Sequence, residues 1–183
     1  SEVKASKSFY DEVKKAGGDA LMWKTGHSLI KAKMSEIKAP LAGEMSGHIF
    51  FADEYYGFDD ALYAALRLLR ILVKTDQRLD EIYDSLPRFY NTPEVRIDCG
   101  DEKKFIIIDE IRNRLRLNKD LKIYDIDGVR VETNDGWWLL RASNTQPALV
   151  ARCESNTKTG FALVKRQISE QLDLSGIKEP IFD

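Results

Sequence analysis

The chain has 183 residues, of which 43% are hydrophobic, and its 28 basic and 30 acidic residues give a formal net charge of −2. This length allows one ordinary domain or two small ones. The near-neutral charge, with basic and acidic residues interleaved, argues against a nucleic-acid or membrane-surface partner. No apolar run reaches the length that a bilayer-spanning helix needs, so we expect no membrane segment.

The first part of the chain alternates strand-like and helical segments. We expect a buried strand at 20–23, a helix from Ser28 to about Glu36 capped by Thr25, strands in the apolar runs 40–42 and 49–51, and a helix that begins after Asp59 or Asp60. That last helix carries apolar residues with helical spacing on one face: Leu62, Leu66, Leu69 and Val73. The alternation predicts an α/β layer with polar loops at one sheet edge.

The pattern changes around residues 86–93, where two prolines lie in a polar and aromatic stretch typical of a connector. Beyond it we expect a strand at 94–98 and then a helix at 104–115, with Phe105, Ile108, Ile111 and Leu115 on one face. A hairpin of 129–133 and 137–140, a strand at 148–153 and a helix at 157–172 should follow. This order predicts a second, α+β domain with a mainly antiparallel sheet.

The two cysteines, Cys99 and Cys153, lie far apart and lack the spacing of a metal site. Cys153 falls in the apolar run 148–153, so we expect a buried free thiol, although sequence alone leaves a disulfide open. Because no other feature indicates an oxidising compartment, we expect a cytoplasmic location. Asp125 and Asp127 lack the further acidic residues of a calcium or magnesium loop, and we interpret this segment as a turn.

The segment Gly43-Glu44-Met45-Ser46-Gly47-His48 is the first candidate site. It places a carboxylate, a hydroxyl and an imidazole between two apolar strand-like runs. A carboxylate accepts hydrogen bonds from two neighbouring hydroxyls, as a sugar diol requires, and glycine lets the backbone approach a ligand closely. The alternative is an ordinary turn with a solvated Glu and His.

The loop Arg141-Ala142-Ser143-Asn144-Thr145-Gln146-Pro147 is the second candidate, and its composition suits a phosphate. Arg141 offers a charged planar fork of donors, and the next residues add neutral donors. The alternative is a plain hairpin connection, because Ser, Asn, Thr and Pro are common in turns.

A third polar loop, Lys24-Thr25-Gly26-His27-Ser28, opens a predicted helix whose N-terminus favours anions. The glycine pattern of a P-loop is missing. His27 and His48 are the only two histidines, and both fall in glycine-flanked polar loops. A lone histidine is more often structural than catalytic, so this is a modest indication of a site.

Taken together, the loops at 24–31, 43–48, 57–60 and 141–145 occur in the order found in the α-D-phosphohexomutases, and the chain resembles the bacterial phosphomannomutase/phosphoglucomutase branch of that family. The resemblance implies that residues 1–86 are an N-terminally incomplete third domain with a mixed α/β sheet, and that residues 87–183 are the C-terminal fourth domain. It departs from the phosphoglucosamine mutases at Met45, where they tend to carry Gln.

The resemblance also implies roles for single residues. Glu44 and Ser46 would bind the sugar hydroxyls, and His48 would transfer a proton to or from the reacting hydroxyl. Lys4 and His27 correspond to positions that line the same cleft. The phosphate distant from the reaction would be bound by the fourth-domain loop, through Arg141, Ser143, Asn144 and Thr145.

The family reaction moves a phosphoryl group between the 1- and 6-positions of a hexose phosphate, through a phosphoserine and a bisphosphate intermediate. The phosphoserine loop and the Asp-Gly-Asp-Gly-Asp loop that binds Mg²⁺ in such enzymes are absent from these residues. We therefore expect no cofactor in this chain, hexose phosphates and the preceding domains of the same polypeptide as partners, and no mutase activity of the chain alone. The alternative is a stand-alone, non-catalytic module that binds sugar phosphates.

Overall fold

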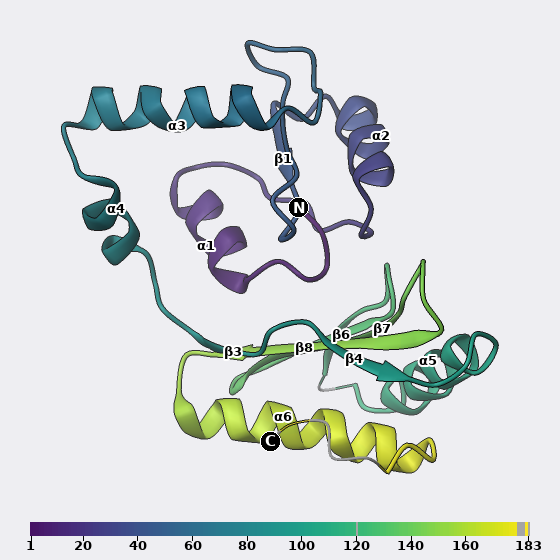
Figure 1. Cartoon of the computed structure of the whole chain (residues 1–183). Coiled ribbons are helices and arrows are strands. Elements are labelled where there is room, and N and C mark those ends of the chain that lie inside the picture. Colours follow the sequence, from purple (N-terminus) through teal and green to yellow (C-terminus); the bar gives the residue numbers. More distant parts are fainter. Residues whose placement is uncertain (120, 179–181, 183) are drawn as a thin grey trace. The chain divides into compact units, whose positions relative to one another are not determined.

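The computed structural model describes residues 1–119, 121–178 and 182, and the chain divides into two compact units, Ser1–Arg88 and Phe89–Asp183 (Figure 1). The N-terminal unit contains α1 (Lys7–Lys15), α2 (His27–Ile37), β1 (Leu41–Gly43), β2 (Ile49–Phe51), α3 (Ala61–Thr75) and α4 (Leu79–Ser85). The C-terminal unit contains β3 (Tyr90–Asn91), β4 (Val95–Asp98), α5 (Lys103–Leu115), β5 (Lys122–Tyr124), β6 (Val129–Thr133), β7 (Gly136–Ala142), β8 (Ala148–Ser155) and α6 (Lys158–Leu174).

The small core of the N-terminal unit lies where α2 packs against the hairpin of β1 and β2. These strands are antiparallel, with Ala42 opposite Phe50. Phe50, Ile30 and Met34 form a buried apolar cluster, in which the two α2 residues are one helical turn apart. Both strands were predicted, and the hairpin brings the polar loop 44–48 to its tip.

Two predictions for residues 20–28 were wrong. The expected strand at 20–23 reduces to a single parallel bridge between Trp23 and Glu2, because only the short segment at the start of the chain lies beside it. The predicted cap, Thr25, does not cap α2. The helix begins at His27 after Gly26, and the Thr25 hydroxyl instead donates to the Glu2 carboxylate at 3.2 Å.

Helix α3 was predicted correctly, including its cap, since Asp60 accepts a hydrogen bond from the Tyr63 N–H at 2.9 Å. Its apolar face is nevertheless uncovered: no residue of α3 is buried, and Leu62 and Val73 are 80% and 84% exposed. The helix is held through Arg67, whose two terminal nitrogens donate to the Asp53 carboxylate at 2.8 and 2.7 Å. This contact lowers the pKa of Asp53 to about 2.

The C-terminal unit has the predicted antiparallel sheet. The described strands follow the order β3-β8-β7-β6-β5, and β4 pairs with β8 beside β3. Every pair is antiparallel. In the hairpin of β6 and β7, Thr133 lies opposite Gly136 across a two-residue turn. The α/β portion followed by a mainly antiparallel α+β domain therefore agrees with the predicted fold class.

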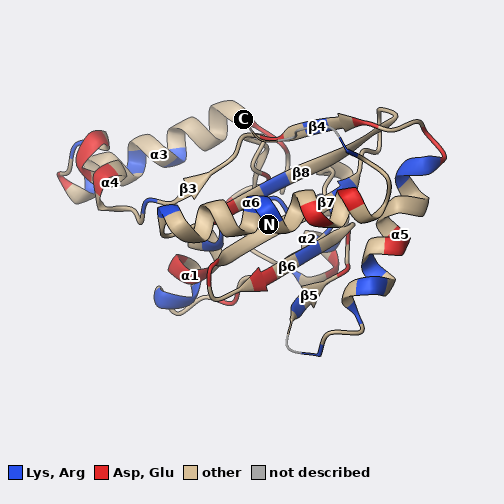
Figure 2. Ribbon diagram, turned by 90° about the horizontal axis from the view of Figure 1, so that it is seen from below, with Lys and Arg blue, Asp and Glu red and all other residues tan. Residues whose placement is uncertain are grey.

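Helices α5 and α6 lie on one face of this sheet (Figure 1) and bury the main core against it. Trp138 points to this core and Trp137 to the other face, and both are almost fully buried, in line with the strand alternation. Helix α5 carries charged residues of both signs along its length (Figure 2). Of the four residues predicted to share one face of α5, Ile108, Ile111 and Leu115 are buried, whereas Phe105 is 56% exposed and the preceding residue, Lys104, is buried.

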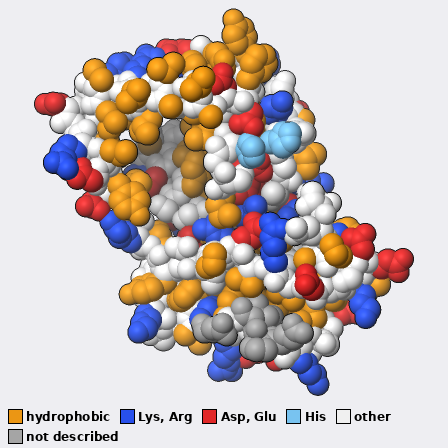
Figure 3. Space-filling model, viewed as in Figure 1, with side chains coloured by type: hydrophobic (Ala, Val, Ile, Leu, Met, Phe, Trp, Pro, Cys, Tyr) orange, Lys and Arg blue, Asp and Glu red, His pale blue; other side chains and the backbone are white. Residues whose placement is uncertain are grey.

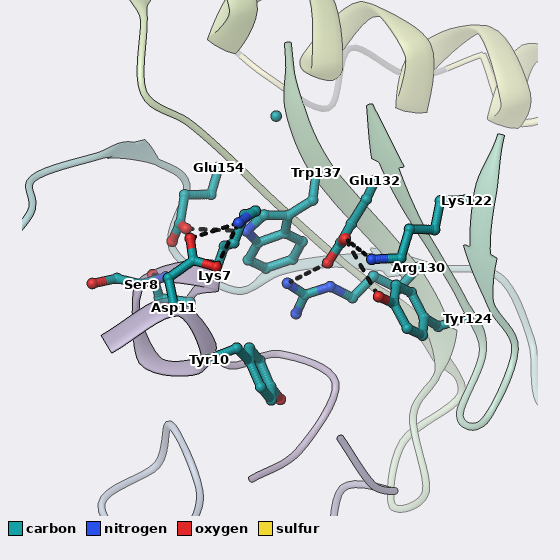
Figure 4. A network of polar contacts seen from close by, with 12 residues as sticks. Lys7, Ser8, Tyr10, Asp11, Lys122, Tyr124, Arg130, Glu132, Trp137 and Glu154 are labelled. Atoms are coloured by element: carbon teal, nitrogen blue, oxygen red, sulfur yellow. Dashed lines mark hydrogen bonds and ion pairs between the residues drawn. The ribbon is translucent and has the colours of Figure 1, made fainter. Parts of the chain in front are cut away.

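The face of the sheet opposite α5 and α6 carries a polar network around Trp137 (Figure 4). The Trp137 indole N–H donates to Glu154 at 3.0 Å, and the Arg130 guanidinium stacks 3.7 Å from the centroid of the same ring. The Lys122 ammonium donates to Glu132 at 3.0 Å. These contacts join β5, β6, β7 and β8 by side chains as well as by their backbone.

Both cysteines are free, and Cys153 is fully buried in the core as predicted. Burial raises the pKa of the Cys153 thiol to about 12. Its backbone N–H donates to the Thr92 hydroxyl at 3.1 Å.

Candidate functional site

The first candidate loop is a closed turn between β1 and β2. The Glu44 N–H donates to the His48 carbonyl at 2.9 Å, and the Gly47 N–H donates to the Glu44 carbonyl at 3.0 Å. Gly47 has a φ of 93°, a value that residues with a side chain rarely adopt. The turn therefore depends on glycine at this position and holds Glu44, Ser46 and His48 on one short segment.

The Glu44 carboxylate connects this loop to the start of α2. Its Oε1 accepts a hydrogen bond from the Gly26 N–H at 2.7 Å. Gly26 has no side chain with which to cap the helix, and the Glu44 carboxylate, bound to the N–H of this N-cap residue, lies beside the positive end of the helix dipole. The structure thus brings together two of the three predicted loops, those at 24–28 and 43–48.

The two histidines lie side by side on the surface, where they form the pale blue patch in Figure 3. The ring centroids of His27 and His48 are 5.7 Å apart. The His48 Nδ1 lies 2.6 Å from the Asp59 carboxylate, which precedes α3. A carboxylate only accepts hydrogen bonds, so this contact assigns the ring proton to Nδ1 and leaves Nε2 as the acceptor of a neutral His48.

Glu2 supports the candidate site and was missed by sequence reasoning. It is fully buried, and its carboxylate accepts hydrogen bonds from the Lys4 N–H at 2.5 Å, the Thr25 hydroxyl at 3.2 Å and the Met45 N–H at 3.2 Å. One carboxylate therefore connects the segments that carry Lys4, His27 and Glu44. Two of its donors lie 23 and 43 residues away, so no local pattern identifies it.

The second candidate loop, in the C-terminal unit, connects β7 to β8. The Ser143 N–H donates to the Ala148 carbonyl at 2.9 Å. The Ser143 hydroxyl accepts the N–H groups of Gln146 at 3.2 Å and Thr145 at 3.4 Å. Ser143 is buried, whereas Asn144 and Thr145 are exposed at the tip. The hydroxyl of Ser143 thus shapes the loop, and Asn144 and Thr145 present the solvent-facing donors.

Arg141 is held rigidly below this loop. It is 4% exposed, and its Nε donates to Asp127 at 3.1 Å. Its Nη2 is buried and has no hydrogen-bond partner among the described residues. A buried N–H group without an acceptor costs about 1–3 kcal/mol. An anion bound at this position would remove that cost.

The turn expected at 125–128 supports Arg141. Gly128 has a φ of 79°, and a Cβ at this position would lie 2.4 Å from both the Arg141 Cβ and the Leu140 carbonyl oxygen. The turn therefore approaches β7 closely because residue 128 has no side chain, and this approach places Asp127 against Arg141. Among the described residues, no group of three or more His, Cys, Asp or Glu side chains is arranged to hold a metal ion.

Comparison with protein families matches residues 1–90 to the phosphoglucomutase/phosphomannomutase alpha/beta/alpha domain III, and residues 94–171 to the C-terminal domain of the same family. The chain belongs to the phosphoglucomutase/phosphomannomutase family. This family of carbohydrate metabolism is the one that the loop order had indicated.

Two curated relatives illustrate the similarity to other family members. The chain is 46% identical to a phosphomannomutase/phosphoglucomutase of Pseudomonas putida over 93% of this chain. It is 41% identical to a phosphoglucomutase of Neisseria meningitidis serogroup A over 94% of this chain. In both cases it spans 37% of the relative's length.

Two solved structures have a fold similar to that of this chain. A phosphoglucomutase/phosphomannomutase family protein from Burkholderia thailandensis matches 99% of this chain with a TM-score of 0.89 and 39% identity, over 38% of its own length. An N-acetylphosphoglucosamine mutase from Aspergillus fumigatus, solved with GlcNAc-6P and magnesium, matches 96% of the chain over 38% of its own length with a TM-score of 0.66. At 14% identity this second match supports the fold alone. In the part of the present chain that the structure describes, no helix is long and apolar enough to cross a membrane.

Proposed function

We propose that this chain supplies the substrate-recognition part of a phosphomannomutase/phosphoglucomutase that interconverts hexose 1-phosphates and hexose 6-phosphates. The observation that carries the proposal is Arg141, whose buried Nη2 lacks an acceptor among the described residues at the base of a donor-rich loop. Guanidinium groups bind phosphate through charge-assisted hydrogen bonds. In the proposal, Arg141, Ser143, Asn144 and Thr145 bind the phosphate that does not react.

The hydroxyls of the sugar are assigned to the loop between β1 and β2. Glu44 is already oriented by the Gly26 N–H, so its carboxylate loses little side-chain entropy when it accepts hydroxyl groups. Ser46 adds a second polar group on the same turn. Lys4 and His27 are assigned to the same sugar site. The Glu2 carboxylate holds the segment of Lys4 beside the loop 43–48, and the ring of His27 contacts the ring of His48.

His48 is the proposed group for proton transfer to or from the reacting hydroxyl. Its Nδ1 contact with Asp59 orients the ring and leaves Nε2 to accept the proton. The phosphoserine and the metal ion would come from preceding domains of the full-length enzyme. The metal would stabilise charge on the transferred phosphoryl group.

The binding part of the proposal is tested by titrating the chain with mannose 1-phosphate while following backbone amide signals. We expect shifts at residues 43–48 and 141–145. Arg141→Lys should weaken the affinity about tenfold, because lysine keeps the charge but loses the planar fork. The matched control is Arg116→Lys. Arg116 is an exposed arginine that pairs with Asp125, in the turn 125–128 that also carries Asp127, the partner of Arg141. A wild-type chain whose spectrum does not change would refute substrate recognition by this chain.

The catalytic part is tested by assaying the chain with mannose 1-phosphate, Mg²⁺ and a hexose bisphosphate activator. We expect no turnover, because the phosphoserine and metal loops are absent from these residues. Measurable conversion to mannose 6-phosphate would contradict this proposal and would require a phosphoryl donor within the chain.

A further inference from the structure

Lys104 is an unusual lysine because its ammonium group lies inside the protein. The residue is 4% exposed, whereas its neighbour Lys103 is exposed. Its Nζ donates to the carbonyls of Ser143 at 2.8 Å and Gln146 at 2.9 Å. It also lies 2.6 Å from a carboxylate oxygen of Asp101. An ammonium group has three donors, and these three contacts account for all of them.

Burying a charged ammonium group costs free energy unless it is paired and hydrogen-bonded. Lysine is therefore rarely buried. Lys104 occupies a core-facing position of α5, between the apolar residues of that helix and the loop from β7 to β8. Both of its carbonyl partners belong to this loop, one near each end, so its contacts fix the backbone of the loop and not one side chain.

The contact with Ser143 has a direct consequence for Asn144. All described peptide bonds are trans, and in a trans peptide the C=O and the following N–H point in opposite directions. When Lys104 binds the Ser143 carbonyl, the Asn144 N–H therefore points away from Lys104. The other carbonyl, that of Gln146, precedes Pro147, which has no N–H. Lys104 thus binds acceptors on the inner side of the loop and directs the Asn144 donor outward.

We propose that Lys104 is a positioning residue for the phosphate-binding loop. It holds the Ser143 and Gln146 carbonyls so that the Asn144 N–H is directed toward the bound phosphate, and its positive charge lies under the loop. Asp101 fixes the ammonium group from the exposed side. The inference rests on the function proposed above for the loop 143–146.

The test compares Lys104→Met with Lys103→Met in the 183-residue chain. Both variants remove one positive charge from the start of α5, but only the first removes the carbonyl contacts. We expect Lys104→Met to speed hydrogen exchange of the Thr145 and Gln146 amides at least tenfold and to lower the affinity for mannose 1-phosphate at least fivefold. Lys103→Met should change both by less than twofold.

A second variant, Asp101→Ala, addresses the case in which Lys104→Met does not fold. It keeps both carbonyl contacts and removes only an exposed partner of Lys104, so we expect faster loop exchange of smaller extent. The proposal would be overturned if Lys104→Met had the same loop exchange rates and the same affinity as the wild type. If Lys104→Met is unfolded, the same result for Asp101→Ala would overturn it. If the wild-type chain binds no sugar phosphate, the proposed function fails, and the exchange rates still decide whether Lys104 orders the loop.

Discussion

The Nδ1 of His48 lies 2.6 Å from the Oδ2 of Asp59, and the backbone fixes this pair as well as the side chains. His48 immediately precedes β2, and Asp59 forms an isolated antiparallel bridge with Phe50 of that strand. The carboxylate is therefore held beside the ring by the main chain. This arrangement favours the Nδ1–H tautomer of a neutral His48.

Replacing Asp59 should change which ring nitrogen of His48 carries the proton. In the wild-type chain at pH 8 we expect the proton on Nδ1, and in Asp59→Ala a shift toward the Nε2–H tautomer, because the acceptor is gone. Long-range ¹⁵N–¹H spectra measure this directly, since the chain has only two histidines. The exposed Asp19→Ala is the control. Identical His48 nitrogen shifts in wild type and Asp59→Ala would contradict the assignment.

Gly128→Ala should destabilise the C-terminal unit more than Gly100→Ala. Both glycines have positive φ, 79° and 72°, so alanine is strained at either position. Only at Gly128 would the added Cβ also overlap neighbouring atoms, 2.4 Å from the Leu140 carbonyl oxygen. We expect losses in the free energy of unfolding of roughly 3 kcal/mol or more for Gly128→Ala and about 1 kcal/mol for Gly100→Ala, measured by urea unfolding. Equal losses would show that the close approach contributes nothing.

Elements with a regular apolar period could be predicted from the sequence. Two strand-like runs around a turn that ends in Gly136 identified the hairpin of β6 and β7, and the helical period identified α3, α5 and α6. Helix α1 was missed, because charged residues dominate its short segment and none of its residues is buried. Single positions were less predictable: the period placed Phe105 on the apolar face of α5, but Phe105 is exposed, and a tertiary contact with the loop 143–146 buries Lys104.

The polar loops were identified because their hydrogen-bonding side chains lie between strand-like or helical runs, with glycine in two of the three loops. Whether the loop residues bind a substrate stays a prediction. Their supporting residues could not be found from the sequence, because each acts through partners distant in the chain. Glu2 reaches Met45, and Asp127 reaches Arg141. Such contacts depend on the tertiary fold and leave no periodic pattern.

Glu2→Gln should loosen the connection between the three segments that Glu2 joins. Its carboxylate accepts from Lys4, Thr25 and Met45, whereas an amide would turn its NH₂ group toward one of these donors. Leaving a buried donor without an acceptor costs about 1–3 kcal/mol, and we expect a loss of this size in urea unfolding of the N-terminal unit. The control is Glu36→Gln, whose exposed carboxylate pairs with Lys33 and should change stability by less than about 1 kcal/mol. A loss no larger than in the control would contradict the role of Glu2.

Cys153 should make the chain less stable at alkaline pH. Burial raises the pKa of its thiol from 9.0 to about 12, so above pH 9 the unfolded chain releases a proton that the folded chain keeps. Its contribution to stability is complete below pH 9 and is lost as pH rises toward 12. Between pH 8 and 10 we expect the wild type to lose about 1.4 kcal/mol more unfolding free energy than Cys153→Ala. Urea unfolding of both proteins at the two pH values measures this difference, and parallel losses would mean that the thiol ionises equally easily in both states.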